Sequence, residues 1–220
     1  MNTETAVIKW RGLQNYQQCW QEMQEFTNTR TEKTLDEFWL LEHPPVFTQG
    51  QAGKPEHILA PGNIPVIKTD RGGQVTYHGP GQLILYPLID LRRKNLSIRK
   101  FVTILENAVI AVMQDFNITA TAKCDAPGVY VNEKKICSIG LRIRRGCTYH
   151  GIAFNIDMNL EPFKRINPCG FNQLEMTQLT HFSKIDSIYA VGMQLVTHLN
   201  LSLGYIATTL HTELNQGINQ

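Results

Sequence analysis

The stretch GVYVNEKKICSIGLRIRRGCTYHGIAFNIDM, residues 128–158, decides the fold that we expect. It is rich in β-branched and aromatic residues, and residues typical of turns interrupt it at NEKK (132–135) and RRG (144–146). In GLRIRR (140–145), apolar Leu141 and Ile143 alternate with two arginines, as in a strand with one buried face. The stretch therefore predicts consecutive antiparallel strands.

The flanking sequence adds further strands and three helices. Apolar residues recur at helical spacing in three segments, and short apolar runs bounded by turn residues indicate strands. No regular alternation of strand and helix runs through the chain, and no low-complexity linker divides it. We therefore expect an α+β fold, with a mixed, mostly antiparallel sheet flanked by helices, in a single domain covering residues 1–220. The expected helices are 14–29, 98–116 and 186–201, and the expected outer strands are 6–10, 37–43, 65–69 and 82–91.

Composition excludes several classes of protein. Apolar residues make up 42% of the 220 and charged residues 18%, as in an ordinary globular protein, and the net charge of +2 is too small for a nucleic-acid binder. No apolar run approaches the ~20 residues that span a bilayer, and no secretory signal opens the chain. The five cysteines show no metal-ligand spacing. We expect a cytoplasmic protein with reduced thiols, no metal and no membrane or nucleic-acid partner.

Basic residues nevertheless cluster in two runs, LRRKNLSIRK (91–100) and LRIRRG (141–146). One interpretation is a pair of solvated faces near turns. The other is a surface that docks an acidic protein, with a salt-sensitive encounter rate.

Four glycines and a proline gather in RGGQVTYHGPGQ, residues 71–82. The segment is neither a P-loop nor a dinucleotide fingerprint, because the lysine and the helix-opening glycine pattern are missing. It is either a plain loop between strands or a site in which Arg71, Tyr77 and His78 lie beside exposed backbone N–H groups. Its TYHG (76–79) recurs at 148–151, which suggests two segments that face one cleft.

Cys169 lies in RINPCGF (165–171), between Pro168 and Gly170. A lone cysteine is either a small buried hydrophobe or a nucleophile, and the flanking residues favour a loop over a packed core. We expect Cys19, on the apolar side of a helix, to be a core residue, and Cys124, Cys137 and Cys147 to be inert.

Three blocks, in this order, resemble the signatures of the lipoyl(octanoyl) transferases, which are related to the catalytic domains of biotin and lipoate protein ligases. The blocks are RGGQVTYHGPGQLILYP (71–87), KKICSIGLRIRRGCTYHGIAFN (134–155) and NPCGF (167–171); LLEHPPVFTQG (40–50) resembles a fourth, N-terminal signature. The likeness covers residues 5–205.

The resemblance implies transfer of an octanoyl group from acyl carrier protein to a lysine of a lipoyl domain, without a cofactor. The acceptors would be subunits of 2-oxoacid dehydrogenases and the glycine-cleavage H protein, and the reaction would be the first step of making protein-bound lipoate. Cys169 would form a thioester with the acyl group, and Lys135 would assist it. The residues alone favour a solvated turn residue at Lys135, because nothing distinguishes it from Lys134 beside it. The implied substrate-binding residues are Arg71, Gly72, Gly73, Gln74, Val75, Thr76, Tyr77, His78, Ser138, Ile139, Gly140, Gly151, Ile152 and Ala153.

Two other functions compete with this one. An ATP-dependent lipoate or biotin ligase on the same scaffold would need no catalytic cysteine, and the NPCGF block argues against it. A binding module without catalysis would form no covalent adduct at Cys169.

Overall fold

A computed structural model describes residues 5–123, 126–168 and 174–212. Within these residues, eight strands form one sheet in the order β11-β1-β2-β6-β10-β9-β8-β7. Their bounds are β1 Thr5–Leu13, β2 Asp36–Glu42, β6 Gln82–Leu88, β7 Thr121–Ala122, β8 Gly128–Val131, β9 Lys134–Arg144, β10 Cys147–Asn155 and β11 Ala207–Thr212. A smaller sheet of order β4-β3-β5 contains β3 Val46–Gln49, β4 Val66–Lys68 and β5 Val75–His78.

The predicted fold class is confirmed. In the large sheet, β1 pairs in parallel with β2 and β11, and the remaining neighbours pair antiparallel. The predicted helices correspond to α1 Tyr16–Thr29, α2 Ile98–Asp115 and α3 Ile188–Leu203, and short 3-10 turns occur at Pro55–His57, Glu161–Arg165 and Leu179–His181.

Each helix begins at a polar residue whose side chain accepts hydrogen bonds from the first turn. Asn15 accepts from the backbone N–H groups of residues 17 and 18, Ser97 from that of residue 100 and Ser187 from that of residue 190. These contacts explain why the helices begin within two residues of the sequence-based limits.

The central antiparallel strands are connected by two tight hairpin turns at the predicted places. Asn132 and Glu133 connect β8 to β9, and Arg145 and Gly146 connect β9 to β10; all four residues have positive φ. Two consecutive residues in this conformation form the type I′ turn that matches the twist of antiparallel strands. The turns fix the register of β9, and hence which of its residues face the interior.

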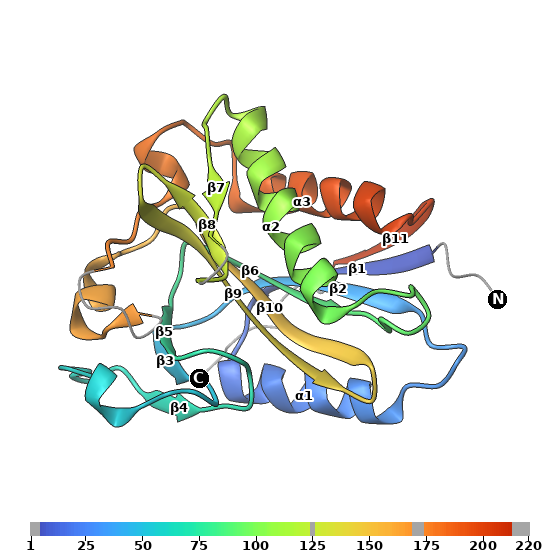
Figure 1. The fold of residues 1–220 in the computed structure, drawn as a ribbon, viewed down its shortest axis with the longest axis horizontal. Helices are drawn as coiled ribbons and strands as arrows, with labels where there is room; N and C mark the ends of the chain where they lie inside the picture. The colour runs from blue at the N-terminus through green and yellow to red at the C-terminus, as the bar shows by residue number, and fades with distance from the viewer. Residues whose placement is uncertain (1–4, 124–125, 169–173, 213–220) are drawn as a thin grey trace.

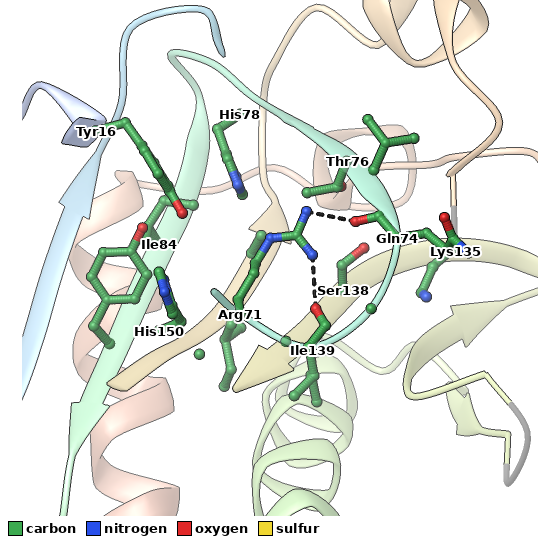
Figure 2. A pocket seen from close by; sticks show the side chains of 18 residues that line it. Tyr16, Arg71, Gln74, Thr76, His78, Ile84, Lys135, Ser138, Ile139 and His150 are labelled. Carbon is green, nitrogen blue, oxygen red and sulfur yellow. Dashed lines mark hydrogen bonds between the residues drawn. The ribbon is translucent and has the colours of Figure 1, made fainter. Parts of the chain in front are cut away.

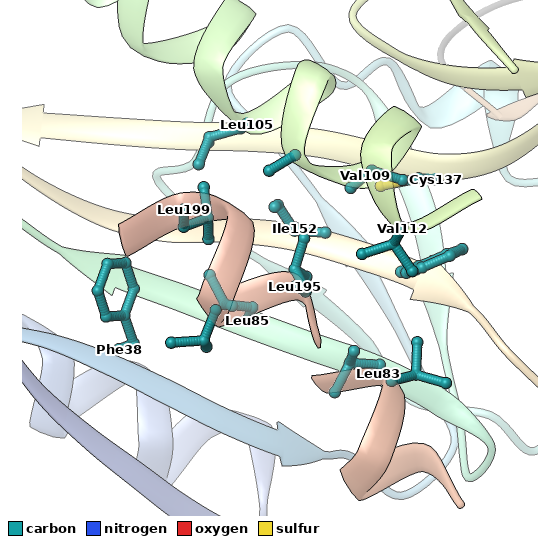
Figure 3. Close-up of a cluster of buried hydrophobic side chains, with 14 of the residues drawn as sticks. Phe38, Leu83, Leu85, Leu105, Val109, Val112, Cys137, Ile152, Leu195 and Leu199 are labelled. Atoms are coloured by element: carbon teal, nitrogen blue, oxygen red, sulfur yellow. The ribbon is translucent and has the colours of Figure 1, made fainter. Parts of the chain in front are cut away.

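Helices cover both faces of the large sheet (Figure 1). Helices α2 and α3 pack on one face over a cluster that includes Leu83, Leu85 and Ile152 (Figure 3). Helix α1 packs on the other face, where Cys19 and Met23 contact alternate residues of the same strands. Strands β2, β6 and β10 are therefore buried on both sides.

The described cysteines are buried, as expected of core thiols. Cys19, Cys137 and Cys147 are reduced and buried, whereas Cys124 lies outside the described residues. No helix in the described part of the chain is long and apolar enough to cross a membrane.

The buried carboxylate of Asp36, at the start of β2, connects three separate parts of the chain. It accepts hydrogen bonds from Arg30 after α1 (2.5 Å), from Arg93 before α2 (2.5 Å) and from the hydroxyl of Tyr205 after α3 (2.6 Å). The aspartate is only 1% exposed, so these hydrogen bonds take the place of contacts with water.

We predict that Asp36→Ala lowers the free energy of unfolding by about 3 to 5 kcal/mol, because it leaves two arginines near the interior without their anion. Urea denaturation measures the change. The matched control, Glu161→Ala, removes an exposed ion pair with Arg165 and should change the stability far less. An Asp36 variant no less stable than this control would contradict the prediction.

Candidate functional site

A cleft opens between the glycine-rich segment and the face of the large sheet that α1 covers (Figure 2). It brings together the predicted substrate-binding residues from the blocks at 71–87 and 134–155, with the exception of Tyr77. The residues that line it are Tyr16, Arg71, Gly72, Gly73, Gln74, Val75, Thr76, His78, Ile84, Tyr86, Lys135, Ser138, Ile139, Gly140, His150, Gly151, Ile152 and Ala153.

Tyr77 points away from the cleft because residues 75–78 form strand β5 rather than an irregular loop. Alternation along a strand places Thr76 and His78 on one face and Tyr77 on the other. The Tyr77 ring lies 5.4 Å from that of Phe47 and 5.5 Å from that of Phe163, between ring centroids. Its visible role is packing in the small sheet.

Arg71 shapes the glycine-rich segment from inside. Its guanidinium donates to the carbonyl and hydroxyl oxygens of Thr48 and to the carbonyl oxygens of Gly72 and Gln74. Figure 2 shows the bonds to the loop. The cation thus holds the backbone of residues 71–74 against β3, and it lines the cleft as well.

Lys135 is buried at 1% exposure, although lysine is among the residues that proteins bury least. It is the second residue of β9 and faces inward, and its Nζ atom lies 5.4 Å from the centroid of the Tyr130 ring. Lys134 faces solvent and forms an ion pair with Glu175 (2.6 Å). The solvated-turn interpretation is therefore wrong for Lys135 and correct for Lys134, because the hairpin register turns the two side chains to opposite faces.

The main chain of Lys135 is paired with the segment that follows Cys169. Its N–H donates to the carbonyl of Glu175 and its carbonyl accepts from the N–H of Thr177, both at 2.9 Å. Cys169 itself lies outside the described residues. The nearest described residues on its two sides, Pro168 and Leu174, line one cavity together with Met176. Met176 forms a β-bridge with Lys135.

The end of the cleft opposite Lys135 is built from histidines and tyrosines that the sequence did not single out as a group (Figure 2). Tyr16 lies near the rings of His78 and His150 at centroid distances of 5.7 and 6.4 Å. His78 and His150 belong to the two TYHG repeats, so both repeats face the same cleft, although His150 lies within strand β10 rather than at its end. The hydroxyl of Tyr86 lies 2.7 Å from Nε2 of His43.

Hydrogen bonds fix the orientation of these rings. Nδ1 of His78 lies 2.7 Å from Oε1 of Gln82, and Nε2 of His150 lies 2.9 Å from the carboxylate of Asp70. Burial lowers the pKa of both histidines below the usual range. Burial alone would raise the pKa of Asp70, but hydrogen bonds from His150, Tyr149 and Trp20 outweigh it and hold that pKa well below its usual range. Neutral rings of fixed orientation therefore close this end.

The described residues contain no group of three histidine, cysteine, aspartate or glutamate side chains arranged to hold a metal ion. The cleft instead combines apolar side chains, among them Ile84 and Ala153, with one buried amine. Such an arrangement suits a ligand with an apolar chain and a reactive group near Lys135.

Comparisons with known proteins agree with this geometry. Residues 15–200 match the family model described as Lipoyl protein ligase A/B catalytic domain. An octanoyltransferase of Shewanella woodyi is 50% identical, over 98% of this chain and 99% of its own, and one of Histophilus somni is 53% identical, over 96% and 100%. A crystal structure of lipoate-protein ligase A bound with ATP superposes with a TM-score of 0.78 at 14% identity, covering 96% of this chain and 90% of the other, which shows a shared fold.

We predict that the protein loses stability as the pH falls from 7.5 to 5. Burial lowers the pKa of His43 from 6.5 to about 4, so the unfolded chain takes up a proton in this range that the folded chain excludes. The stability from this group is fully present above pH 6.5 and is lost as the pH approaches 4, about 2 kcal/mol by pH 5. Urea denaturation at each pH tests this, and the loss should be smaller in His43→Gln; equal losses in both proteins would contradict it.

Proposed function

The chain belongs to the Lipoyl protein ligase A/B catalytic domain family, and from this premise we propose that it is an octanoyltransferase, which transfers an octanoyl group to the lysine of a lipoyl domain. The observation that carries the proposal is the near-complete alignment, at about half identity, with named octanoyltransferases. A buried lysine at one end of an apolar cleft supports it. We propose that residues 1–220 act as a single catalytic domain, since the first and last described strands, β1 and β11, pair with each other in the large sheet.

Cys169 is the proposed nucleophile. Its thiolate attacks the carbonyl carbon of an octanoyl thioester, a new C–S bond forms, and the donor thiol leaves with a proton. The amine of the acceptor lysine then attacks the acyl-enzyme, a C–N bond replaces the C–S bond, and the cysteine regains its proton. No ATP is required, because the activated acyl bond arrives with the donor.

Lys135 is the proposed partner of this sulfur. As an ammonium it would stabilise the thiolate, and as a neutral amine it would take the proton from the thiol and later from the acceptor. Both roles require a side chain that faces the interior, as that of Lys135 does. The β-bridge between Met176 and Lys135 supports this partnership, because Met176 follows Cys169 by only seven residues in the sequence.

The cleft beyond Lys135 would hold the acyl chain. Each buried methylene contributes ~0.8 kcal/mol, so the seven carbons beyond the carbonyl would contribute roughly 5 kcal/mol. The remaining predicted substrate residues would then wall the chain along β9 and β10, with Gly140 and Gly151 keeping the walls apart. The aromatic rings of Tyr16, Tyr86 and His150 form the end of the cleft that is far from Lys135.

We propose acyl carrier protein as the donor, and lipoyl domains of 2-oxoacid dehydrogenases and the glycine-cleavage H protein as acceptors. A cytoplasmic location fits these partners and the reduced thiols of Cys19, Cys137 and Cys147.

The two basic runs of the sequence meet on one surface, which supports docking of an acidic partner. The N–H of Leu91 donates to the carbonyl of Gly146 (2.9 Å), so the turn before α2 lies against the β9–β10 hairpin. Four exposed basic residues mark this surface, and none makes an ion pair with another described residue: Arg99, Lys100, Arg144 and Arg145.

An apolar groove beside this surface leads to the site. Ile98 and Val102 of α2 face Leu141 and Ile143 of β9 across it, and Lys135 lies at its inner end. A donor docked on the four basic residues would therefore be beside the route to the proposed reaction centre.

We predict that the octanoyl donor acylates Cys169 without ATP, which separates a transferase from a ligase. Mass spectrometry after mixing with octanoyl acyl carrier protein should show one octanoyl adduct on the peptide that contains Cys169. Cys169→Ala should lose both the adduct and turnover, whereas Lys135→Ala should keep the thiol and acylate on the order of 10²–10⁴-fold more slowly.

Cys147→Ala and Lys134→Ala are the matched controls, and both should acylate as the parent protein does. No adduct at all would favour a binding module, and acyl transfer that requires ATP would favour a ligase. An adduct that persists in Cys169→Ala would place the nucleophile elsewhere.

We predict that Arg144→Glu with Arg145→Glu raises the KM for the protein donor on the order of tenfold at low salt and leaves kcat unchanged. The effect should shrink as salt screens the surface charges, and a small octanoyl thioester should react as before. Lys184→Glu, an exposed lysine before α3, is the control. An unchanged KM at low salt would count against this docking surface.

A further inference from the structure

Glu106 is a buried carboxylate on a helix face that is otherwise apolar. It belongs to α2 and is 8% exposed, with Leu105 and Val109 beside it in the layer that covers the sheet. A carboxylate in such a place is costly unless it accepts hydrogen bonds. Its oxygen accepts one from the backbone N–H of Gly128, at 3.0 Å and away from solvent.

Gly128 in turn lies directly against the side chain of Lys135. A Cβ atom built at Gly128 would be 2.5 Å from Cε and 3.2 Å from Nζ of this lysine, and the residue has φ +139°. Glycine is thus required here on two counts, conformation and space. The bond from Glu106 therefore holds the strip of backbone on which the methylenes of Lys135 rest.

A second bond holds the same strip at Ala126. The hydroxyl of Tyr130 donates to the carbonyl of Ala126 (2.8 Å), and the Tyr130 ring is the one near Nζ of Lys135. Ala126, Pro127 and Lys135 line one groove together with Val102, which lies one turn before Glu106 on the same face of α2. Through the side chain of Glu106, helix α2 is therefore bonded to the backbone that lies against Lys135.

Lys135 and Glu106 both act on the buried thiol of Cys137. Burial raises the pKa of Cys137, Lys135 acts to lower it, and Glu106 acts to raise it. The carboxylate is thus close enough to influence groups beside the lysine, although its direct contact is with Gly128.

We infer that Glu106 is a positioning residue for Lys135: through the N–H of Gly128 it sets where the amine lies relative to the acyl group. The inference rests on the proposed role of Lys135 in octanoyl transfer. Misplacing a reacting group by about 1 Å can cost on the order of 100-fold in rate, so a residue with no contact to substrate can control the reaction.

Two variants of similar size separate the hydrogen bond from the charge. Glu106→Gln keeps an oxygen acceptor for Gly128 and removes the charge, whereas Glu106→Met keeps the volume and removes the acceptor. The measured quantities are the rate constant of acyl-enzyme formation at saturating donor, and the donor concentration that gives half of it. We expect Glu106→Met to slow acylation on the order of 10- to 100-fold with the half-saturating concentration unchanged, and Glu106→Gln to remain within about threefold.

The control on the same helix is Asp115→Ala, which removes an exposed pair with His198 and should acylate normally. Amide exchange of Gly128 by NMR should quicken in Glu106→Met and stay slow in Glu106→Gln. If Glu106→Met does not fold, Glu106→Asp, which withdraws the acceptor by one methylene, should show the same slowing at unchanged half-saturation.

Three results would overturn the inference: normal acylation by the variants that lose or withdraw the acceptor, equal slowing in Glu106→Gln, or a change confined to the half-saturating concentration. The parent protein and Lys135→Ala are assayed alongside. An inactive parent would instead refute the proposed function, and a fully active Lys135→Ala would refute the proposed role of Lys135, so these failures are distinguishable from failure of the inference.

Discussion

The pairing between the main chain of Lys135 and residues 175–177 is the constraint on which the site depends. It joins the central hairpin to a segment that the chain reaches only after the 3-10 turn at Glu161–Arg165, and it makes the lysine part of a hydrogen-bonded ladder. A buried amine on a free loop would turn to solvent, because the ammonium is costly to bury. Fixed in a ladder on one side and covered by Gly128 on the other, it is held in the interior.

Local signals explain how much of the fold was predictable. Helix caps at Asn15, Ser97 and Ser187 and the type I′ turns after β8 and β9 each depend on a few neighbouring residues, and a single sequence displays them. The strand of residues 75–78 was not predicted, because its glycine-rich approach resembles a loop and its pairing with β3 lies about thirty residues away.

The site was predictable in its membership and less so in its roles. The residues alone could not separate Lys135 from Lys134, since only the register of β9 decides which one faces inward; the resemblance to a family made the choice. Arg71 lines the cleft as expected, but its hydrogen bonds to Thr48, which is remote in sequence, could not be predicted. Glu106 gave no signal, because one glutamate in an apolar helix looks like an ordinary interruption.

The wall of the cleft is also part of the core. Ile84, Tyr86 and Ala153 line the space proposed for the acyl chain, and the same residues pack under helix α1 with Cys19 and Met23. Stability and substrate range are therefore coupled in this protein. Smaller side chains that admit a longer acyl chain would also weaken the packing of helix α1 on the sheet. A change in acyl-chain specificity during evolution would therefore be expected to require changes in α1 that restore this packing.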